Sequence, residues 1–568
     1  MCKIGITFAQ NFLICAMETI PSFISYIEQS IKKNWDYDAL TDYKGITLQY
    51  KDVARKIEKL HIIFEHCGIQ KGDKIALCGR NSCGWAVAFF ATLTYGAVAV
   101  PIQHEFKPEQ IYHIVEHSES KLLLVGDVVS TTIDPAMMPN IEGVIYLPDF
   151  SLICSRNEKL DYVRENLNAL FGAKYPKYFR PEHVIYHKDE PEELAIINYT
   201  SGTTGFSKGV MIPYRAMWSN LDFAFGALGS RLKTHSNVLS ILPMAHMYGQ
   251  ALEFIFNFCY GNHIFFLTRL PSPSTVATAC DEIHPVILIT VPMVVEKIIR
   301  KRVLPKLQQP HIKMLMNMPV ISKKLKQKVC EYIVDGFGGN IYEIIVGGAA
   351  LNNEIEQFLL NVGFPFTVGY GTTETAPMIS YCDYTEFVPG TCGKIEPHME
   401  MKVLSEDPEN IEGEVLARGM NVMLGYYKNE EATKAVIDND GWYHTGDRGT
   451  INSDGYLFIR GRIKNMLLGS NGQNIYPEEI ENRLNSMPLV SESLIIQEDD
   501  HFVGLVYPDK DGMEQMGFAV SDVADVMEQN RVNLNVTLPS FSKISEIRLR
   551  EEEFEKTPKK SIKRYLYN

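Results

Sequence analysis

The sequence predicts an α/β protein with a large N-terminal part and a smaller C-terminal part. Short apolar runs alternate with helical patterns along most of the chain, and the patterned segments shorten after Gly461. A chain of 568 residues is long enough for several domains with ample buried core. Its content of 45% hydrophobic and 22% charged residues is ordinary for a globular protein.

The first elements predicted are a strand, a helix and a second strand in direct succession. Lys74–Cys78 and Ala97–Val100 are apolar runs typical of buried strands, and we expect Pro101 to end the second. Trp85–Thr94 between them fits a helix. The same alternation continues, because further apolar runs predict strands at 184–185, 194–197, 238–242, 264–267 and 286–290.

After Gly461 the segments are short, and charged runs follow at 551–553 and 559–560. We therefore expect an N-terminal domain of residues 17–461 and a C-terminal domain of residues 462–568. Residues 1–16 carry an early lysine and an apolar stretch that Gln10 and Asn11 interrupt. A signal peptide has a continuous apolar region, so we interpret residues 1–16 as an N-terminal extension.

Charge and cysteine usage limit the partners and the compartment. The net charge of -14 and pI near 5.6 argue against nucleic acid, since phosphate-binding surfaces need clustered lysine and arginine. The same balance weakens the case for an anionic membrane surface, although local basic runs leave peripheral membrane contact open. The 11 scattered cysteines form no Cys-x-x-Cys pair, which favours reduced thiols in the cytoplasm. No apolar run reaches the length of a membrane-spanning helix.

The most informative segment is Tyr-Thr-Ser-Gly-Thr-Thr-Gly-Phe-Ser-Lys-Gly at residues 199–209. Glycines let a backbone approach an anion closely, hydroxyls donate hydrogen bonds, and Lys208 adds a positive charge. The segment therefore predicts a phosphate-binding loop, with a polar surface loop as the alternative. It is not a Walker A loop, in which serine or threonine follows the lysine. The candidate phosphate-binding residues besides Lys208 are Thr200, Ser201, Gly202, Thr203, Thr204 and Gly205.

Three later segments carry groups suited to a nucleotide and a cation. In residues 368–375, Glu374 stands beside hydroxyls, which suits Mg²⁺ because this ion prefers oxygen ligands; a helix N-terminal acid is the alternative. Residues 344–351 are a strand running into a glycine turn, either a seat for a flat base or a plain strand-to-helix turn. In residues 440–447, the carboxylate of Asp447 can accept two hydrogen bonds at once.

These motifs, in this order, resemble those of the adenylate-forming superfamily, which includes acyl-CoA synthetases, nonribosomal-peptide adenylation domains and luciferases. The phosphate loop departs from the family pattern at Ser207, where proline is usual. The resemblance extends through residues 461–472 and 475–481 and covers nearly the whole chain. It implies ATP, Mg²⁺ and coenzyme A as ligands, with Thr204 and Glu374 holding the metal.

The resemblance also implies a role for each matching residue. Tyr370 would lie near adenine, Asp447 would bind both ribose hydroxyls, and Arg462 would face the ribose. Lys464 would be the hinge between the two domains. The other nucleotide-binding positions that match are Gly348, Ala349, Gly371, Thr372 and Thr373.

Residues 242–249, Leu-Pro-Met-Ala-His-Met-Tyr-Gly, match a family motif whose histidine lies beside the substrate carboxylate. The match implies an acyl pocket lined by His246, Met247, Tyr248 and Gly249. Without it, a histidine in an apolar stretch is more often a satisfied core residue. Residues 291–305 and the basic stretch up to Lys328 look most like long-chain fatty acyl-CoA synthetases, although charge runs are commonly solvated helix faces.

Relatives end with a lysine that contacts the carboxylate and the α-phosphate, in long-chain members within Thr-Pro-x-x-Lys-x-Lys-Arg. Here residues 557–564 are Thr-Pro-Lys-Lys-Ser-Ile-Lys-Arg, so Ser561 occupies the lysine position. Lys560 is the first candidate to replace it, and Lys563 the second. On a loop a neighbouring lysine can reach the same point, whereas on a strand it would point to the opposite face.

The implied activity is that of an acid–thiol ligase. A fatty acid and MgATP would give an acyl-adenylate and pyrophosphate, and the coenzyme A thiol would then displace AMP. Lys560, His246, Thr204 and Glu374 are the expected catalytic residues. A fatty acyl-AMP ligase, an acyl-acyl-carrier-protein synthetase and a nucleotide-binding pseudoenzyme, which Ser561 would favour, stay open as alternatives. The sequence also leaves open a homodimer.

Overall fold

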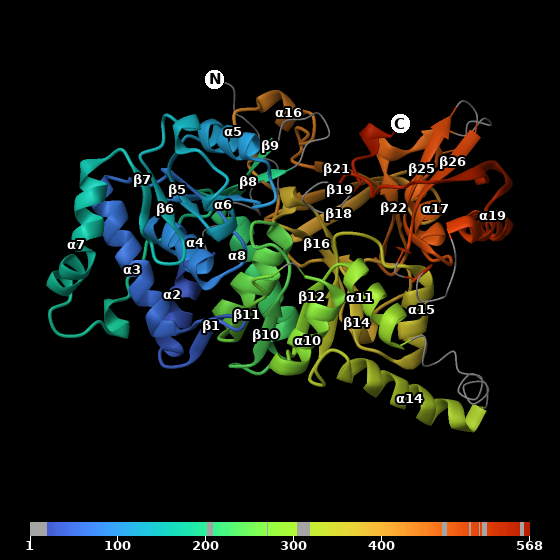
Figure 1. Ribbon diagram of the computed structural model, residues 1–568, viewed down its shortest axis with the longest axis horizontal. Helices are drawn as coiled ribbons and strands as arrows, with labels where there is room; N and C mark the ends of the chain where they lie inside the picture. Colours follow the sequence, from blue (N-terminus) through green and yellow to red (C-terminus); the bar gives the residue numbers. More distant parts are fainter. Residues whose placement is uncertain are drawn as a thin grey trace, which may run out of the picture.

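The computed structural model describes residues 20–200, 208–269, 271–303, 319–468, 474–498, 501–510, 512–513, 520–556 and 562–567. Figure 1 shows a large body of sheets and helices, with the smaller C-terminal unit (orange to red) at one end. The predicted α/β class, with a large N-terminal and a small C-terminal part, is confirmed.

One sheet of eight strands runs through the large part. In spatial order its strands are β20 (Gly425–Tyr426), β9 (Lys208–Pro213), β8 (Leu194–Thr200), β4 (Val98–Ile102), β3 (Lys74–Cys78), β5 (Ser120–Val125), β6 (Gly143–Tyr146) and β7 (Leu152–Ser155). Strands β8, β4, β3, β5 and β6 pair in parallel. Ile75 and Leu77 of β3 pack into one buried cluster, and Ala76 and Cys78 pack into another. Both faces of the sheet are therefore covered, as a parallel sheet requires.

Helices α3 (Tyr50–Cys67) and α4 (Cys83–Tyr95) belong to the first cluster, and α5 (Pro108–Ser118) belongs to the second. Almost every side chain of α4 is buried, which explains why its sequence has no polar face. The helix starts where the Ser82 side chain accepts a hydrogen bond from the Trp85 N–H. It ends at Gly96, whose φ of 87° is left-handed.

Two smaller sheets position the later motifs. The first contains β10 (Asn237–Ser240), β11 (His263–Phe266), β1 (Asp38–Asp42) and β2 (Thr47–Gln49), and the second contains β12 (Ile287–Thr290), β13 (Glu343–Val346) and β14 (Phe366–Val368). The helices of this region and of the periphery are α2 (Phe23–Lys33), α6 (Asp127–Ser130), α7 (Glu158–Lys174), α8 (Tyr214–Ala224), α9 (Asn257–Tyr260), α10 (Pro273–Ile283), α11 (Pro292–Ile298), α14 (Pro319–Asp335), α15 (Asn353–Val362) and α16 (Glu430–Lys434).

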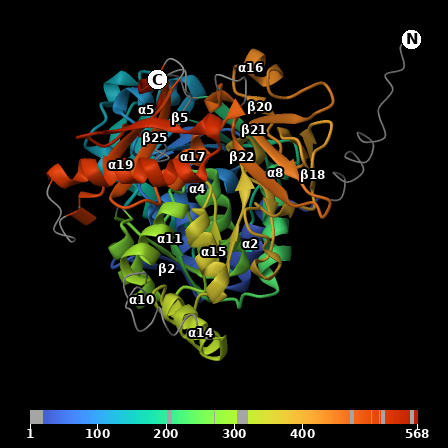
Figure 2. The same cartoon turned by 90° about the vertical axis from the view of Figure 1, so that its right-hand side faces the viewer.

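Antiparallel sheets lead towards the C-terminal unit. They contain β15 (Tyr370–Gly371), β16 (Met378–Tyr381), β17 (Lys394–Ile395), β18 (Met399–Leu404), β19 (Gly413–Gly419), β21 (Tyr443–Ile451) and β22 (Leu457–Arg462). The C-terminal unit contains the hairpin β23 (Leu467–Leu468) and β24 (Asn474–Ile475), the sheet β25 (Val490–Glu498), β26 (His501–Pro508) and β27 (Ile544–Leu549), and the helices α17 (Pro477–Leu484) and α19 (Val520–Thr537). Both helices pack with this sheet around a separate apolar core (Figure 2).

The strands predicted from apolar runs are confirmed except at three points. Residues 241–242 lie in the loop after β10, which ends at Ser240. Residues 184–185 lie outside any strand, after a short 3₁₀ turn, and Ile185 is 77% exposed. Pro101 does not end its strand, because β4 continues to Ile102. Proline lacks an N–H donor, but β4 pairs with β8 only at Ala99, so the missing donor is tolerated.

Candidate active site

A buried carboxylate on β21 is central to the site. Asp447 is only 4% exposed. The Tyr370 hydroxyl donates to Asp447 Oδ2 at 2.6 Å, and Arg462 Nε lies 3.0 Å from Asp447 Oδ1. Asp447 and Arg462 are direct partners across the β21–β22 ladder. Three side chains from three separate sequence motifs are therefore in direct contact.

The electrostatics of this group suit a neutral diol. Burial raises the pKa of Asp447, and the Arg462 charge and the Tyr370 hydrogen bond oppose that rise. The Asp447 charge in turn raises the pKa of the Arg462 guanidinium. Burial raises the pKa of the Tyr370 phenol well above its usual value, so it remains a donor. A carboxylate has about four acceptor positions, so two protein partners leave capacity for two ligand hydroxyls.

A second carboxylate, Glu374, lies close to the residue that ends the phosphate loop. It belongs to the 3₁₀ turn Thr373–Thr375, so it is not the N-terminal acid of an α-helix. The Tyr426 hydroxyl donates to Glu374 Oε1 at 3.0 Å, and Lys208 Nζ lies 4.8 Å from the centre of the Tyr426 ring. Pairing of β20 with β9 brings Tyr426 to this position. Tyr426 thus contacts both Glu374 and Lys208.

Lys464 lies within electrostatic reach of both carboxylates. Burial lowers the pKa of Lys464, and the Arg462 charge lowers it further, whereas the Asp447 and Glu374 charges oppose the effect. The residue predicted to be the hinge therefore lies beside the charged groups of the nucleotide motifs.

A glycine turn after β13 forms another wall of the site. The Tyr248 hydroxyl donates to the carbonyl oxygen of Ile345 at 3.1 Å, and a Cβ added at Gly347 would lie 2.9 Å from that hydroxyl. Glycine therefore allows the turn to lie against the tyrosine ring. Gly348 has a left-handed φ of 83°, and Gly348 and Ala349 are both exposed. An exposed backbone turn of this kind can receive a flat base.

The turn after Tyr370 also depends on glycine. A Cβ at Gly371 would lie 1.8 Å from the carbonyl oxygen of Pro377, and the Thr372 N–H donates to that same oxygen at 2.9 Å. At the phosphate loop, Thr200 and Lys208 are direct partners across the β8–β9 ladder. The connecting candidates Ser201, Gly202, Thr203, Thr204 and Gly205, together with Lys560 and Ser561, lie outside the described residues.

A loop from Ser240 to His246 carries the predicted histidine, and buried polar side chains that the sequence analysis missed hold it. Glu253 is 0% exposed and accepts from the N–H groups of Ile241 and Leu242, both at 3.1 Å. Amide side chains hold the rest of the loop: Asn81 bonds Leu242 and Met244, Asn198 bonds Ala245, and Gln250 bonds Met244. Burial raises the pKa of Glu253 to about 8. Its sequence signal is an isolated acid in the apolar run 249–258.

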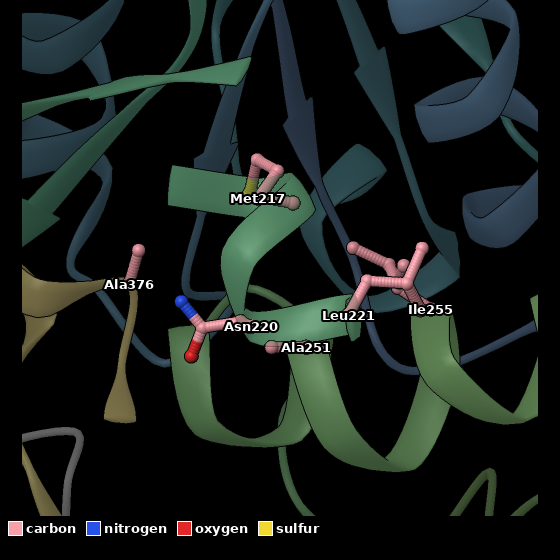
Figure 3. Close-up of a pocket in the computed structure, with 6 residues that line it drawn as sticks. All are labelled: Met217, Asn220, Leu221, Ala251, Ile255 and Ala376. Atoms are coloured by element: carbon pink, nitrogen blue, oxygen red, sulfur yellow. The ribbon is translucent and has the colours of Figure 1, made fainter. Parts of the chain in front are cut away.

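A small pocket lies between α8 and the π-helix η4 (Gly249–Phe256). Met217, Asn220 and Leu221 of α8, Ala251 and Ile255 of η4, and Ala376 line it (Figure 3). Most of these side chains are apolar, and the Asn220 Oδ1 accepts from the Met378 N–H at 3.1 Å. The pocket lies between the helix that follows the His246 loop and the turn that contains Glu374.

The four residues predicted to line an acyl pocket, 246–249, differ from one another in exposure and contacts. His246 is half-buried, and its Nδ1 lies 3.3 Å from the Tyr248 backbone nitrogen. Met247 is 0% exposed and Tyr248 is 9% exposed. A Cβ at Gly249 would lie 2.9 Å from Leu242 Cβ, so this glycine serves close packing. The lining of the small pocket includes Ala251 and Ile255 and none of these four residues.

Among the described residues, no group of three His, Cys, Asp or Glu side chains could hold a metal ion alone. Mg²⁺ typically keeps several waters and binds through one or two carboxylates together with substrate phosphates. Glu374, close to Lys208 of the phosphate loop, fits such a site. In the described part of the chain, no helix has the length and apolar character needed to cross a membrane.

Comparisons with known proteins agree with this geometry. Residues 27–427 match the AMP-binding enzyme family, and residues 464–567 match the AMP-binding enzyme C-terminal domain. Human long-chain-fatty-acid--CoA ligase ACSBG2 is 25% identical over 530 residues, 88% of this chain and 77% of that protein. The peroxisomal long chain acyl-CoA synthetase 6 of Arabidopsis thaliana is 27% identical over 557 residues, 91% of this chain and 76% of that protein. The family resemblance inferred from the motifs is confirmed.

Solved structures share the fold. The anthranilate CoA ligase AuaEII in complex with anthranoyl-AMP aligns with a TM-score of 0.77 at 18% identity, covering 96% of each chain. The o-succinylbenzoate CoA synthetase MenE from Bacillus subtilis aligns with a TM-score of 0.71 at 19% identity, covering 96% of this chain and 98% of that one. A Mycobacterium tuberculosis fatty acyl CoA synthetase aligns with a TM-score of 0.64 at 20% identity, covering 96% and 97%. The acids named for these proteins differ, so the likeness supports the fold alone.

Proposed function

The chain belongs to the AMP-binding enzyme family, and we propose that it activates a long-chain fatty acid with ATP and transfers the acyl group to coenzyme A. The observation that carries the proposal is the contact of Tyr370 and Arg462 with the buried Asp447, close to Glu374 and Lys208. A diol-binding carboxylate and a phosphate-binding lysine near an acid are the groups that MgATP needs. The names of the curated relatives support a long-chain fatty acid as the substrate.

In the first step, the substrate carboxylate attacks the α-phosphorus of ATP and pyrophosphate leaves. Asp447 accepts the ribose hydroxyls, the turn at Gly348 receives the adenine, and Lys208 compensates phosphate charge. Glu374, and Thr204 by resemblance, would hold Mg²⁺, which supplies charge neutralisation on the phosphates when bound. Most of the acceleration would come from positioning and electrostatics.

His246 would orient the substrate carboxylate, as the resemblance of residues 242–249 to the family motif implies. Lys560 would contact the carboxylate and the α-phosphate from the C-terminal domain. Domains of residues 17–461 and 462–568, joined at the Lys464 hinge, would then turn relative to each other. That turn withdraws Lys560 and lets the coenzyme A thiol attack the acyl carbonyl, with AMP as the leaving group. We propose a cytoplasmic location for this reaction, with residues 1–16 as an extension.

The test is AMP release with MgATP, coenzyme A and a panel of unbranched acids from acetate to oleate, with benzoate as an aromatic acid. Activity that rises with chain length would support the proposal, and activity confined to short or aromatic acids would refute the substrate assignment. Pyrophosphate release without a coenzyme A thioester would indicate a carrier-protein acceptor. Ser561 favours one alternative, a binding-only protein. Nucleotide binding by calorimetry without turnover on any acid would support that alternative.

A further inference from the structure

The C-terminal unit meets the large part of the molecule end to end, through the C-terminus of α17 and the N-terminus of α15. In both Figure 1 and Figure 2, α15 lies next to α17. Asn352, which is 5% exposed, caps α15, and its Oδ1 accepts from the N–H groups of Glu354 and Ile355 at 3.1 and 3.3 Å. Its Nδ2 donates across the interface to the carbonyl oxygen of Asn482 at 3.0 Å and also contacts the Ser486 hydroxyl. One side chain therefore completes the ends of two helices.

Two neighbours on the N-terminal side reinforce this contact. Glu296 Oε1 accepts from the Asn352 backbone N–H at 2.9 Å, and Arg300 Nη1 donates to the Ser486 carbonyl oxygen at 3.4 Å. The last carbonyls of a helix have no partner within it and carry partial negative charge. Arg300 and the positive N-terminus of α15 both face that charge. The two helix ends are thus electrostatically complementary.

The contact between Asn352 and α17 lies close in sequence to the turn expected to bind adenine. Strand β13 ends at Val346, the turn with Gly348 and Ala349 follows, and Asn352 comes three residues after Ala349. The turn runs directly from β13 to the capped end of α15. A base that binds on the turn would steady the backbone that carries Asn352, and a shift of α17 would pull on the same backbone.

We propose that Asn352 couples nucleotide binding to the orientation of the C-terminal domain, by docking α17 only when the adenine turn is ordered. The proposal rests on the proposed function, because it assumes that the C-terminal domain turns during the reaction. Coupling of this kind is reciprocal: a docked α17 must strengthen nucleotide binding by the factor by which the nucleotide strengthens docking. Loosening the interface should therefore weaken AMP binding even though no altered atom touches the nucleotide.

The experiment measures AMP affinity by calorimetry in three interface variants and one control variant of the full chain. Asn352→Ser keeps a capping oxygen but is too short to reach α17, and we expect AMP binding to weaken about fivefold, the equivalent of one lost hydrogen bond. Ser486→Ala alters the opposite side of the interface and should weaken binding about threefold. The double variant should bind AMP no more weakly than Asn352→Ser alone, because Asn352→Ser already removes the contact between α15 and α17. The control is Asn361→Ser, near the other end of α15, which removes an exposed hydrogen bond from Lys326 of α14 and should leave AMP binding normal.

The outcomes separate this proposal from the proposed function. The coupling would be overturned if Asn352→Ser and Ser486→Ala both bound AMP as tightly as the wild-type protein within error. Asn352 would then be a helix cap only. The coupling would also be overturned if the double variant lost as much AMP-binding free energy as the two single variants together, since independent effects do not share one contact. Failure of the unaltered protein to bind AMP would refute the proposed function itself.

Discussion

Removal of one hydroxyl, in Tyr370→Phe, tests how the buried Asp447 is kept in a state that can bind ribose. In the described part of the chain, the hydroxyl is one of two side-chain groups that contact the Asp447 oxygens, at 2.6 Å. The other is Arg462, whose side chain is 49% exposed and therefore partly screened by water. We expect the variant to bind ATP and AMP about tenfold more weakly, because a hydrogen bond to a charged group contributes about 1.5–3 kcal/mol.

The pH dependence of the variant gives a second test. Burial already raises the pKa of Asp447, and loss of the Tyr370 donor must raise it further, because that donor favours the ionised form. Only the carboxylate accepts from two hydroxyls, so nucleotide affinity should fall as pH decreases through the pKa of Asp447. In Tyr370→Phe this fall should begin at a higher pH than in the wild-type protein.

The assay is calorimetric AMP binding between pH 5 and 8, with Tyr50→Phe as the matched control. Tyr50 is also buried, but its hydroxyl donates to the carbonyl oxygens of Phe258 and Asn262, remote from the nucleotide motifs. The control should lose about 1 kcal/mol of stability and keep its AMP affinity. If Tyr370→Phe bound AMP as the wild type does at every pH, Tyr370 would not support Asp447 in the way described.

Four further predictions concern the hinge, the C-terminal lysines, Glu253 and Glu374. Lys464→Pro should spare pyrophosphate release and impair thioester formation, and an equal loss in both half-reactions would argue against a hinge. Ser561→Lys should speed adenylation, whereas Lys560→Ala should slow it far more than Lys563→Ala; equal effects of the two alanine variants would exclude the assignment of Lys560. The pKa of Glu253 is raised from 4.5 to about 8, so stability should fall as pH rises from 4.5 towards 8. Denaturant unfolding should find a flatter pH profile in Glu253→Gln, and an unchanged profile would mean that Glu253 does not titrate there. Glu374→Gln should weaken MgATP binding at least tenfold more than AMP binding, and calorimetry showing equal losses would remove its cation role.

The parts of the site that could be predicted from sequence are those whose signal is local. Tyr370, Glu374 and Asp447 stand in short motifs that combine an apolar strand with glycine and polar residues, and such combinations are visible within a few positions. The contact of Tyr370 with Asp447 joins residues far apart in the chain, and only the resemblance to a family predicted that they would meet. Glu253 and Asn352 were missed because their partners depend on how distant elements pack. Residues 184–185 show the opposite error, since two apolar side chains are too short a run to indicate a strand.

The two carboxylates of the site differ in surroundings, and that difference divides their tasks. Asp447 is 4% exposed and directly opposite a guanidinium, so its charge is largely compensated before any ligand arrives. A compensated carboxylate attracts cations weakly but still accepts hydrogen bonds, which suits neutral hydroxyls. Glu374 accepts from a phenol, which is neutral and leaves its negative charge in place. A carboxylate whose hydrogen-bond partner is neutral, close to the lysine of the candidate phosphate loop, is suited to a divalent cation shared with phosphate oxygens. If the proposed function holds, we therefore expect Arg462 to matter as much as Asp447 in determining which acid would bind ribose and which would bind Mg²⁺.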